Sequence, residues 1–297
     1  MAVIGNDAGL TIDRILLATD LTPASEMVAR YAEMLARRYE SKLTLVHVVD
    51  LSAVIKSEDA GAGFALEHAR QTSTSEMTNL LERIVHNGVP AIGHSLESRN
   101  PAAAIVRFAD EIDADLIVAG THSRRGLSRI VLGSCAEGII RHATCPVITL
   151  GTNTKPVRDG QHSFGNIVFA TDFGSNAEAK VHIALAFAQD AASKIYLCHV
   201  LEHARKEIPD GLEIRLKVEE MMGKMIPRSA YDWCDPECVV EEGDAADHIL
   251  ELARSKEADL IILGARHSSS WLVHLNDGVV GRILREAECP VMTIGSK

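Results

Sequence analysis

The residues from Gly120 to Ser134 have the types and spacing of an anion-binding loop. Gly120 ends an apolar run of strand length, and Gly133-Ser134 opens a stretch with helical periodicity. The first backbone N–H groups of a helix have no partner inside it, and the helix dipole makes that end positive. The loop also carries three arginines, Arg124, Arg125 and Arg129. This spacing predicts a phosphate site.

A basic loop stands out because the whole chain is acidic. Its formal net charge is −11, from 30 basic and 41 acidic residues. Nucleic acids and anionic membranes require a basic surface, so neither is an expected partner. The sequence shows no basic stretch followed by an apolar core, and no apolar run approaches the ~20 residues that span a bilayer. With six thinly spread cysteines, these features predict a cytoplasmic protein with reduced thiols.

The elements that must position the loop occur twice. Arg14-Ile-Leu-Leu-Ala-Thr-Asp20 matches Asn166-Ile-Val-Phe-Ala-Thr-Asp172, and Ala114-Asp-Leu-Ile-Val-Ala-Gly120 matches Ala258-Asp-Leu-Ile-Ile-Leu-Gly264. Such self-similarity indicates a tandem duplication. We expect domains at 1–150 and 164–297, joined by a linker at 151–163 that has no apolar periodicity.

Each copy alternates apolar runs with stretches of helical period, which is typical of βαβ units and a parallel sheet. The expected strands of the first copy are 14–19, 42–49, 91–96, 116–120 and 147–150, and its expected helices are 23–39, 66–86, 101–112 and 134–142. The prediction is an α/β protein with two tandem doubly wound, Rossmann-like domains of five parallel strands. Ligands of such sheets bind at the carboxyl ends of the strands, where Asp20 and Gly120 lie.

The chain resembles the universal stress protein family in its tandem-domain form. The resemblance rests on Ala-Thr-Asp20, Leu-Val-His47-Val48, the loop from Gly120 to Ser134 and Thr144-Cys-Pro-Val147. Nucleotide-binding members have Gly, two residues, Gly, nine residues and Gly-Ser/Thr. The first copy keeps this pattern except for Ser123 at the middle glycine. A second departure is Arg99-Asn100-Pro101, where the family has Gly-x-Pro near the phosphates.

The resemblance implies a stress-response or regulatory protein that binds ATP, with Mg²⁺, in its first domain. It implies that Asp20 contacts the adenosine, that Val48 presents backbone atoms to the adenine, and that the loop lines the triphosphate. The residues of the loop in this role are Gly120, Ser123, Arg124, Gly133 and Ser134. It also implies a pseudo-dimer of the two domains and a possible homo-oligomer through the last strands.

Structural roles compete with each of these assignments. Gly120 can simply end a strand, Ser134 can cap a helix, Val48 can be a core residue, and Asp20 can form an Asx turn or a helix cap. The alternative function is a scaffold or dimerisation module that binds no nucleotide. A more distant one, by fold analogy alone, is an enzyme of adenylate chemistry. No catalytic residue is identifiable, so at most weak ATP hydrolysis is expected.

The second copy lacks the features of the loop. Ser268, Ser269 and Val273 replace the three arginines, and Asp277-Gly278 replaces Gly133-Ser134. A carboxylate at that place would repel a phosphate. We therefore expect a degenerate site in the second domain.

One cysteine pair, Cys234 and Cys238, has a spacing that zinc ligands can show, with His199 and His203 as conceivable further ligands. No second cysteine pair lies nearby, and Cys238 opens an apolar run. The pattern favours core residues over a metal site. His47 and His199 occupy matching positions, which favours a shared structural role.

Overall fold

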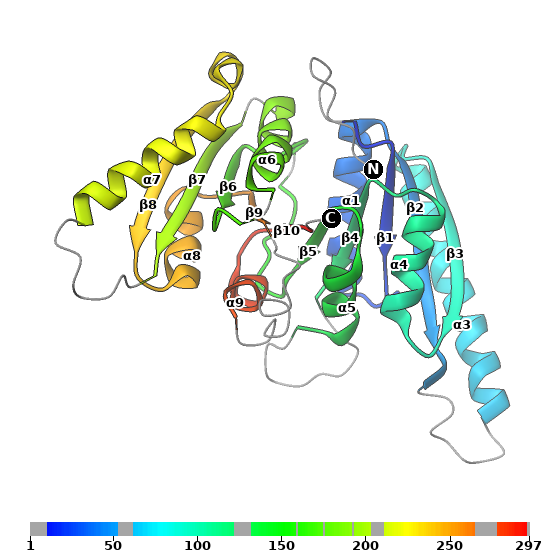
Figure 1. The fold of residues 1–297 in the computed structure, drawn as a ribbon. Coiled ribbons are helices and arrows are strands. Elements are labelled where there is room, and N and C mark those ends of the chain that lie inside the picture. Colours follow the sequence, from blue (N-terminus) through cyan, green and yellow to red (C-terminus); the bar gives the residue numbers. More distant parts are fainter. Residues whose placement is uncertain are drawn as a thin grey trace. The chain divides into compact units, whose positions relative to one another are not determined.

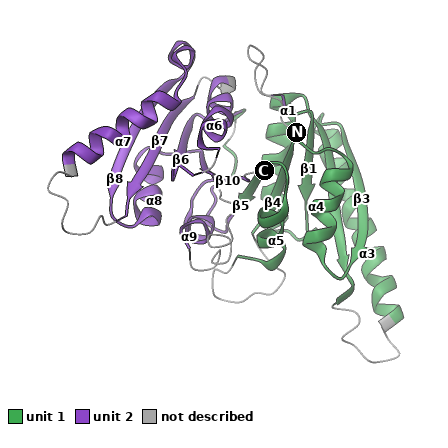
Figure 2. Cartoon of the chain, viewed as in Figure 1, with its two compact units in different colours: residues 1–2, 12–149, 156–162 green, residues 3–11, 150–155, 163–297 purple. Residues whose placement is uncertain are grey.

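The computed structural model describes residues 11–52, 62–121, 132–158, 160–174, 176–191, 193–202, 211–264 and 278–295. The chain divides into two compact units (Figure 2). The first contains Ile12–Thr149 and Pro156–His162, and the second contains Leu150–Lys155 and Ser163–Lys297. In each unit, strands and helices alternate around a parallel sheet, which confirms the predicted fold class.

The sheet of the first unit has the strand order β3-β2-β1-β4-β5. The chain therefore adds strands on one side of β1 and then crosses to the other side, so the order reverses at β1. Crevices at such a point are where doubly wound sheets bind ligands. The elements are β1 (Arg14–Ala18), α1 (Ser25–Tyr39), β2 (Lys42–Asp50), α3 (Ala62–His86), β3 (Ala91–Ser98), α4 (Pro101–Glu111), β4 (Leu116–Gly120), α5 (Ser134–His142) and β5 (Val147–Leu150).

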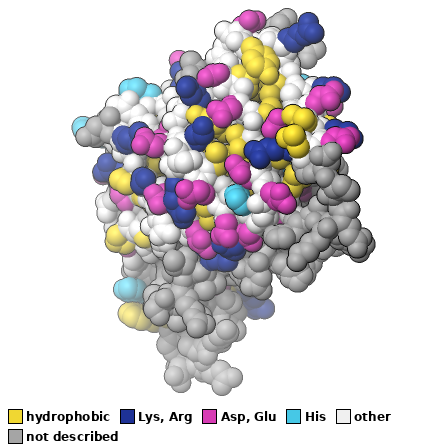
Figure 3. All heavy atoms as spheres, turned by 90° about the vertical axis from the view of Figure 1, so that its left-hand side faces the viewer, with side chains coloured by type: hydrophobic (Ala, Val, Ile, Leu, Met, Phe, Trp, Pro, Cys, Tyr) yellow, Lys and Arg dark blue, Asp and Glu magenta, His cyan; other side chains and the backbone are white. Residues whose placement is uncertain are grey.

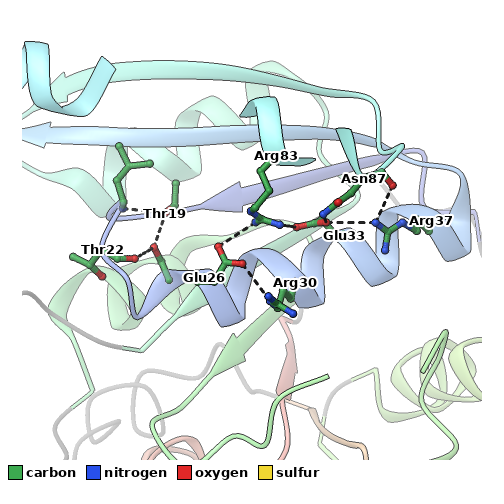
Figure 4. A network of polar contacts seen from close by, with 10 residues as sticks. Thr19, Thr22, Glu26, Arg30, Glu33, Arg37, Arg83 and Asn87 are labelled. Carbon is green, nitrogen blue, oxygen red and sulfur yellow. Dashed lines mark hydrogen bonds and ion pairs between the residues drawn. The ribbon is translucent and has the colours of Figure 1, made fainter. Parts of the chain in front are cut away.

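Helices cover both faces of this sheet, α1 and α3 on one and α4 and α5 on the other (Figure 1). The central strands β1 and β4 are consequently apolar and buried along nearly their whole length. A polar network ties α1 to α3 (Figure 4). Its centre is the buried carboxylate of Glu33, which accepts hydrogen bonds from Arg83 at 2.7 Å and Asn87 at 3.0 Å.

The second unit repeats this topology with the order β10-β9-β6-β7-β8. One difference is a 3-10 helix, η1, ahead of the edge strand β8. The elements are β6 (Asn166–Ala170), α6 (Ala177–Ala191), β7 (Lys194–Leu201), α7 (Gly211–Met225), η1 (Arg228–Asp232), β8 (Asp235–Glu242), α8 (Ala245–Ser255), β9 (Leu260–Gly264), α9 (Val279–Glu286) and β10 (Val291–Ile294).

Specific hydrogen bonds recur at matching positions of the two units. The Asp115 carboxylate accepts from the N–H groups that open β1, and Asp259 accepts in the same way from those that open β6. Nδ1 of His47 donates to the carbonyl of Thr19 at 2.9 Å, and Nδ1 of His199 donates to that of Thr171 at 2.7 Å. The duplication thus extends to the polar contacts that hold the strand ends.

On the face of the second unit that Figure 3 presents, apolar side chains lie among acidic and basic ones. Three large apolar side chains of α7 are exposed: Leu212, Leu216 and Met221. No helix in the described parts of the chain combines the length and apolar composition needed to cross a membrane.

Candidate functional site

Five of the seven predicted ligand residues are described by the structure, and all five lie at or beside carboxyl ends of strands in the first unit. Asp20 follows β1, Val48 is near the end of β2, Gly120 is the last residue of β4, and Gly133-Ser134 lie where α5 begins. The other two, Ser123 and Arg124, lie outside the described residues, as do Arg125 and Arg129. The structure therefore describes the site where the strands end and where α5 begins.

Asp20 forms the Asx turn that was one of its two predicted roles. Its Oδ1 accepts from the backbone N–H of Thr22 at 3.0 Å and from the Thr22 hydroxyl at 2.7 Å. Leu21 between them has a left-handed φ of 58°. Asp172 accepts from the N–H of Gly174 at 2.9 Å in the matching turn of the second unit, where Phe173 has a φ of 54°. The turn is common to both copies and says nothing specific about a ligand.

The backbone of Val48 faces the space beyond the end of β1. The Thr19 N–H donates to the Val46 carbonyl, so the polar groups of Val46 point toward β1, and alternate residues of a strand point the same way. Pairing of β1 with β2 ends at Ala18 and Val46, whereas β2 continues alongside β3 to Asp50. The N–H and C=O of Val48 therefore point past β1, toward the turn of Asp20. A donor and an acceptor side by side match the hydrogen-bonding edge of adenine.

The two ends of the loop between β4 and α5 are joined by a hydrogen bond. The Gly133 N–H donates to the Thr121 carbonyl at 3.0 Å. Gly120 lies in a tight place, because a Cβ there would lie 3.2 Å from Cγ2 of Val28. Gly133 is the N-cap of α5 with φ −64° and ψ 139°, which other residues adopt readily. The cap makes no side-chain hydrogen bond, so the first-turn N–H groups of α5 remain available to an anion.

Two carboxylates give this part of the edge a negative charge. Cys135, in the first turn of α5, has its pKa raised to about 11, first by burial and then by the charges of Asp50 and Asp20. Both carboxylates are therefore close enough to act on the start of α5. Oxygen donors of this kind suit a hard cation such as Mg²⁺.

A groove of about 600 Å³ runs between α4 and α5. Ser134 lines it together with Asn100, the N-cap of α4. The two helices pack tightly, because a Cβ on Gly138 would lie 2.5 Å from the Cβ of Ala102. The N-terminal turns of α4 and α5 are consequently neighbours, and both direct their positive ends toward the carboxyl edge of the sheet.

The departure at Arg99 carries no backbone strain. Arg99 is not among the residues with positive φ, whereas its counterpart Gly243 in the second unit has a φ of 140°. The first unit therefore does not need glycine at this position, and arginine fits the turn as it stands.

The second unit fills the corresponding region with its own ion pairs. Arg282, the counterpart of Gly138, donates to Asp244 at 2.9 Å and to Asp247 at 2.5 Å. The pKa of Asp244 is lowered, mainly by the N–H of Asp247 and then by Arg282. In the first unit, the uncharged Asn100 and Ala103 stand in place of these two carboxylates. Asp277, the other carboxylate that distinguishes the second copy, lies outside the described residues.

The cysteine pair occupies the edge of the second unit. Cys238 lies in β8 and Cys234 just before it, both half-buried. Burial is the main cause that raises the pKa of both thiols, that of Cys234 to about 11, which disfavours the thiolate that binds zinc. His199 is engaged with Thr171, and His203 is outside the described residues. Within the described ranges, no three His, Cys, Asp or Glu side chains gather as a metal site would require.

The sequence pattern did not predict the groove. It also did not predict that Asn100, Cys135 and Gly138 lie around Ser134. The spacing of the two helices along the chain does not reveal that they pack together. One signal was present: Gly138 lies inside a stretch of helical period, where a glycine costs stability and so often marks a close contact.

Comparison with known proteins agrees with this architecture. The model of the universal stress protein family matches residues 11–150 and 163–295. A protein of Staphylococcus saprophyticus named as a universal stress protein is 32% identical over 148 residues, which cover 50% of this chain and 88% of that one. A relative from Staphylococcus aureus is also 32% identical over 148 residues, covering 50% and 89%.

Solved structures are similar over almost the full length. A universal stress protein from Archaeoglobus fulgidus has a TM-score of 0.72 at 18% identity, covering 96% of this chain and 97% of that one. One from Pseudomonas aeruginosa has a TM-score of 0.66 at 18% identity, covering 96% and 93%. At these identities the structures show a shared fold, and the family is shown by the sequence matches to both units. The chain belongs to the universal stress protein family.

Proposed function

We propose that the first unit binds an adenine nucleotide, with ATP as its ligand, and that the bound nucleotide regulates this stress protein in the cytoplasm. The observation that carries the proposal is the position of Val48. Its N–H and C=O point past the end of β1, at the same edge where the N-terminus of α5 offers unpaired N–H groups. An adenine-recognising edge and a phosphate-recognising helix end thus lie on one side of one sheet.

The parts of the nucleotide fit different parts of this edge. The adenine would pair with the backbone of Val48, and the ribose would lie near Asp20. The phosphates would lie at Gly133-Ser134, where the helix dipole and the first-turn N–H groups favour negative charge. The joined ends of the loop, Thr121 and Gly133, hold this helix start against β4.

Asp20 and Asp50 give the proposed site the oxygen donors for Mg²⁺. This ion usually binds through one or two carboxylates together with substrate phosphates. When bound, it would supply the positive charge that lets phosphates lie near two carboxylates. The side chains would hold the ion and orient it, and none of them is suited to activate water for hydrolysis.

We propose no such role for the second unit. Asp244 and Asp247 place two carboxylates at the start of α8, and both pair with Arg282. An incoming phosphate would have to displace these ion pairs. The six free thiols of the chain are what a reducing cytoplasm maintains, which supports that part of the proposal.

The test is the nucleotide content of the freshly purified full-length protein. After denaturation, anion-exchange chromatography of the supernatant should show close to one adenine nucleotide per chain, and calorimetry of the emptied protein should show binding of Mg·ATP. Absence of both would reject the proposal and favour the scaffold function. A content near two per chain would contradict the inactivity of the second unit.

A further inference from the structure

In the part of the first unit that the structure describes, Arg99 is an exposed arginine with no hydrogen bond or ion pair. Among the described arginines of the first unit, it is the one that takes part in no hydrogen bond or ion pair. Glu97, the nearest acidic residue in the chain, is already bound by Arg70, with Nε at 2.6 Å and Nη2 at 3.0 Å. In a protein of net charge −11, Arg99 is thus an exposed positive charge that is not paired with a carboxylate and is available to an anion.

Local hydrogen bonds fix the backbone on both sides of Arg99. The Asn100 N–H donates to the hydroxyl of Ser98 at 3.0 Å, and that hydroxyl donates to the Asn100 carbonyl at 3.1 Å. Asn100 in turn accepts from the N–H of Ala103 at 3.1 Å, which starts α4. The Cα of Arg99, from which its side chain extends, is therefore held between the end of β3 and the N-terminus of α4.

The Cα of Arg99 is close to the proposed phosphate site. Asn100, the next residue, lines the same groove as Ser134, and α4 meets α5 within two residues of Asn100, at Ala102. The long arginine side chain starts at the carboxyl edge of the sheet, beside two neighbouring helix N-termini. Arg99 thus directly precedes a residue of the groove that Ser134 also lines.

The second unit has the opposite arrangement of charge at this place. It has Gly243 instead of Arg99, and the acidic residues that follow, Asp244 and Asp247, pair with Arg282 of the same unit. The first unit has Arg99 and no acidic residue at the start of α4. Its positive charge is therefore left for an external anion.

We propose that Arg99 binds the terminal phosphates of the nucleotide and gives the first unit a preference for a triphosphate over a monophosphate. This inference rests on the proposed function. Guanidinium groups bind phosphate oxygens through paired N–H donors. A monophosphate, held by the start of α5, would not extend to Arg99, whereas the end of a longer phosphate chain would.

The test compares AMP and ATP, each with Mg²⁺, by calorimetry on the full-length protein and its Arg99→Ala variant. The variant should bind ATP about tenfold more weakly, the scale of one hydrogen bond to a charged group, and AMP within twofold of the wild type. Arg99→Lys should recover part of the loss. Arg30→Ala, which removes an exposed arginine from α1 (paired with Glu26 at 3.2 Å), is the control for net charge and should change neither affinity.

Salt provides a second readout. The ATP affinity of the wild type should fall with ionic strength more steeply than that of Arg99→Ala, because one phosphate contact is missing from the variant. Unchanged ATP affinity in Arg99→Ala, or an equal loss for AMP and ATP, would overturn the role of Arg99. If the wild type binds neither nucleotide, the proposed function itself fails; if it binds both and the variant behaves like it, only the role of Arg99 fails.

Discussion

At the scale of single residues, a residue that holds the fold together can also present polar groups at the carboxyl edge of the sheet. Val48 is the clearest case. The end of β1 determines that its backbone N–H and C=O point past that strand. Oδ1 of Asp20 accepts the hydrogen bond that closes its turn, as Oδ1 of Asp172 does in the second unit. Gly133 needs no special φ, so its small size near a ligand is the property that a substitution would test.

A charge at Gly133 separates ligand binding from folding. Both Asp and Asn are good N-caps, so Gly133→Asp and Gly133→Asn should leave α5 intact or slightly more stable. Aspartate would repel the phosphates, and we expect Gly133→Asp to abolish ATP binding in calorimetry. Gly133→Asn, of nearly the same size, should retain most of the affinity. Equal affinities for the two variants would place the phosphates elsewhere.

At the scale of elements, the site depends on how α4 packs against α5. The missing Cβ of Gly138 lets Ala102 approach, and that approach brings the start of α4 beside the start of α5. The matching position in the second unit holds Arg282, which shows that the same pair of helices tolerates different contacts.

Substitution of two helical glycines tests this packing. Gly138→Ala should lower the free energy of unfolding by about 1–3 kcal/mol, because the added methyl overpacks the contact with Ala102. Gly223→Ala in α7 is the matched control: nothing lies within 4 Å of its added Cβ, and the higher helix propensity of alanine should stabilise by up to about 1 kcal/mol. Urea unfolding measures both. A neutral Gly138→Ala would show that α4 and α5 are not in close contact.

At the scale of the whole molecule, the chain combines duplicated architecture with unequal chemistry. Both units hold their strand ends with the same aspartate and histidine contacts. Their helix N-termini differ in charge, and this difference underlies the expectation of one nucleotide per chain. The boundaries predicted at 1–150 and 164–297, and the pairing of the units as a pseudo-dimer, stay predictions.

Thiol reactivity reports on the burial of cysteines across both units. Burial raises the pKa of Cys145, Cys198 and Cys289 to about 12 and is the largest cause of the rise to about 11 at Cys135. At pH 8 these thiols are almost wholly protonated, so alkylation in the folded protein should be slower than in urea by roughly 100-fold at Cys135 and by roughly 1,000-fold at the other three. The protonated state of these buried thiols also contributes to the stability of the fold. Because their pKa values are raised in the folded state, this contribution is fully present below the pKa of the unfolded state, near 9. It is lost as the pH rises toward 11–12.

Iodoacetamide labelling followed by mass spectrometry measures this directly. In urea, all six cysteines should react at similar rates. Rapid labelling of Cys145 or Cys289 in the folded protein at pH 8 would contradict their burial.

The sequence by itself determined the duplication, the fold class and the order of strands and helices. Strand runs such as Leu116–Gly120 are apolar on both faces, and glycines and prolines mark their ends, so local pattern is enough to locate them. Expected and observed bounds agree closely, with the largest shift at α3, which begins at Ala62 instead of residue 66. The sequence also predicted the places of Asp20 and Gly133-Ser134 in the fold, because they follow a strand or open a helix; their role in binding stays a prediction.

Only the tertiary structure decided which of these residues share a surface and what each one contacts. The outward direction of the Val48 backbone depends on the end of β1, whose pairing with β2 stops at Val46, two residues before Val48. That Asn100 and Ser134 line the same groove depends on the contact between Ala102 and Gly138, which are far apart in the chain. Such relations arise from packing between elements, and a local pattern of residue types contains no information about the distance between them.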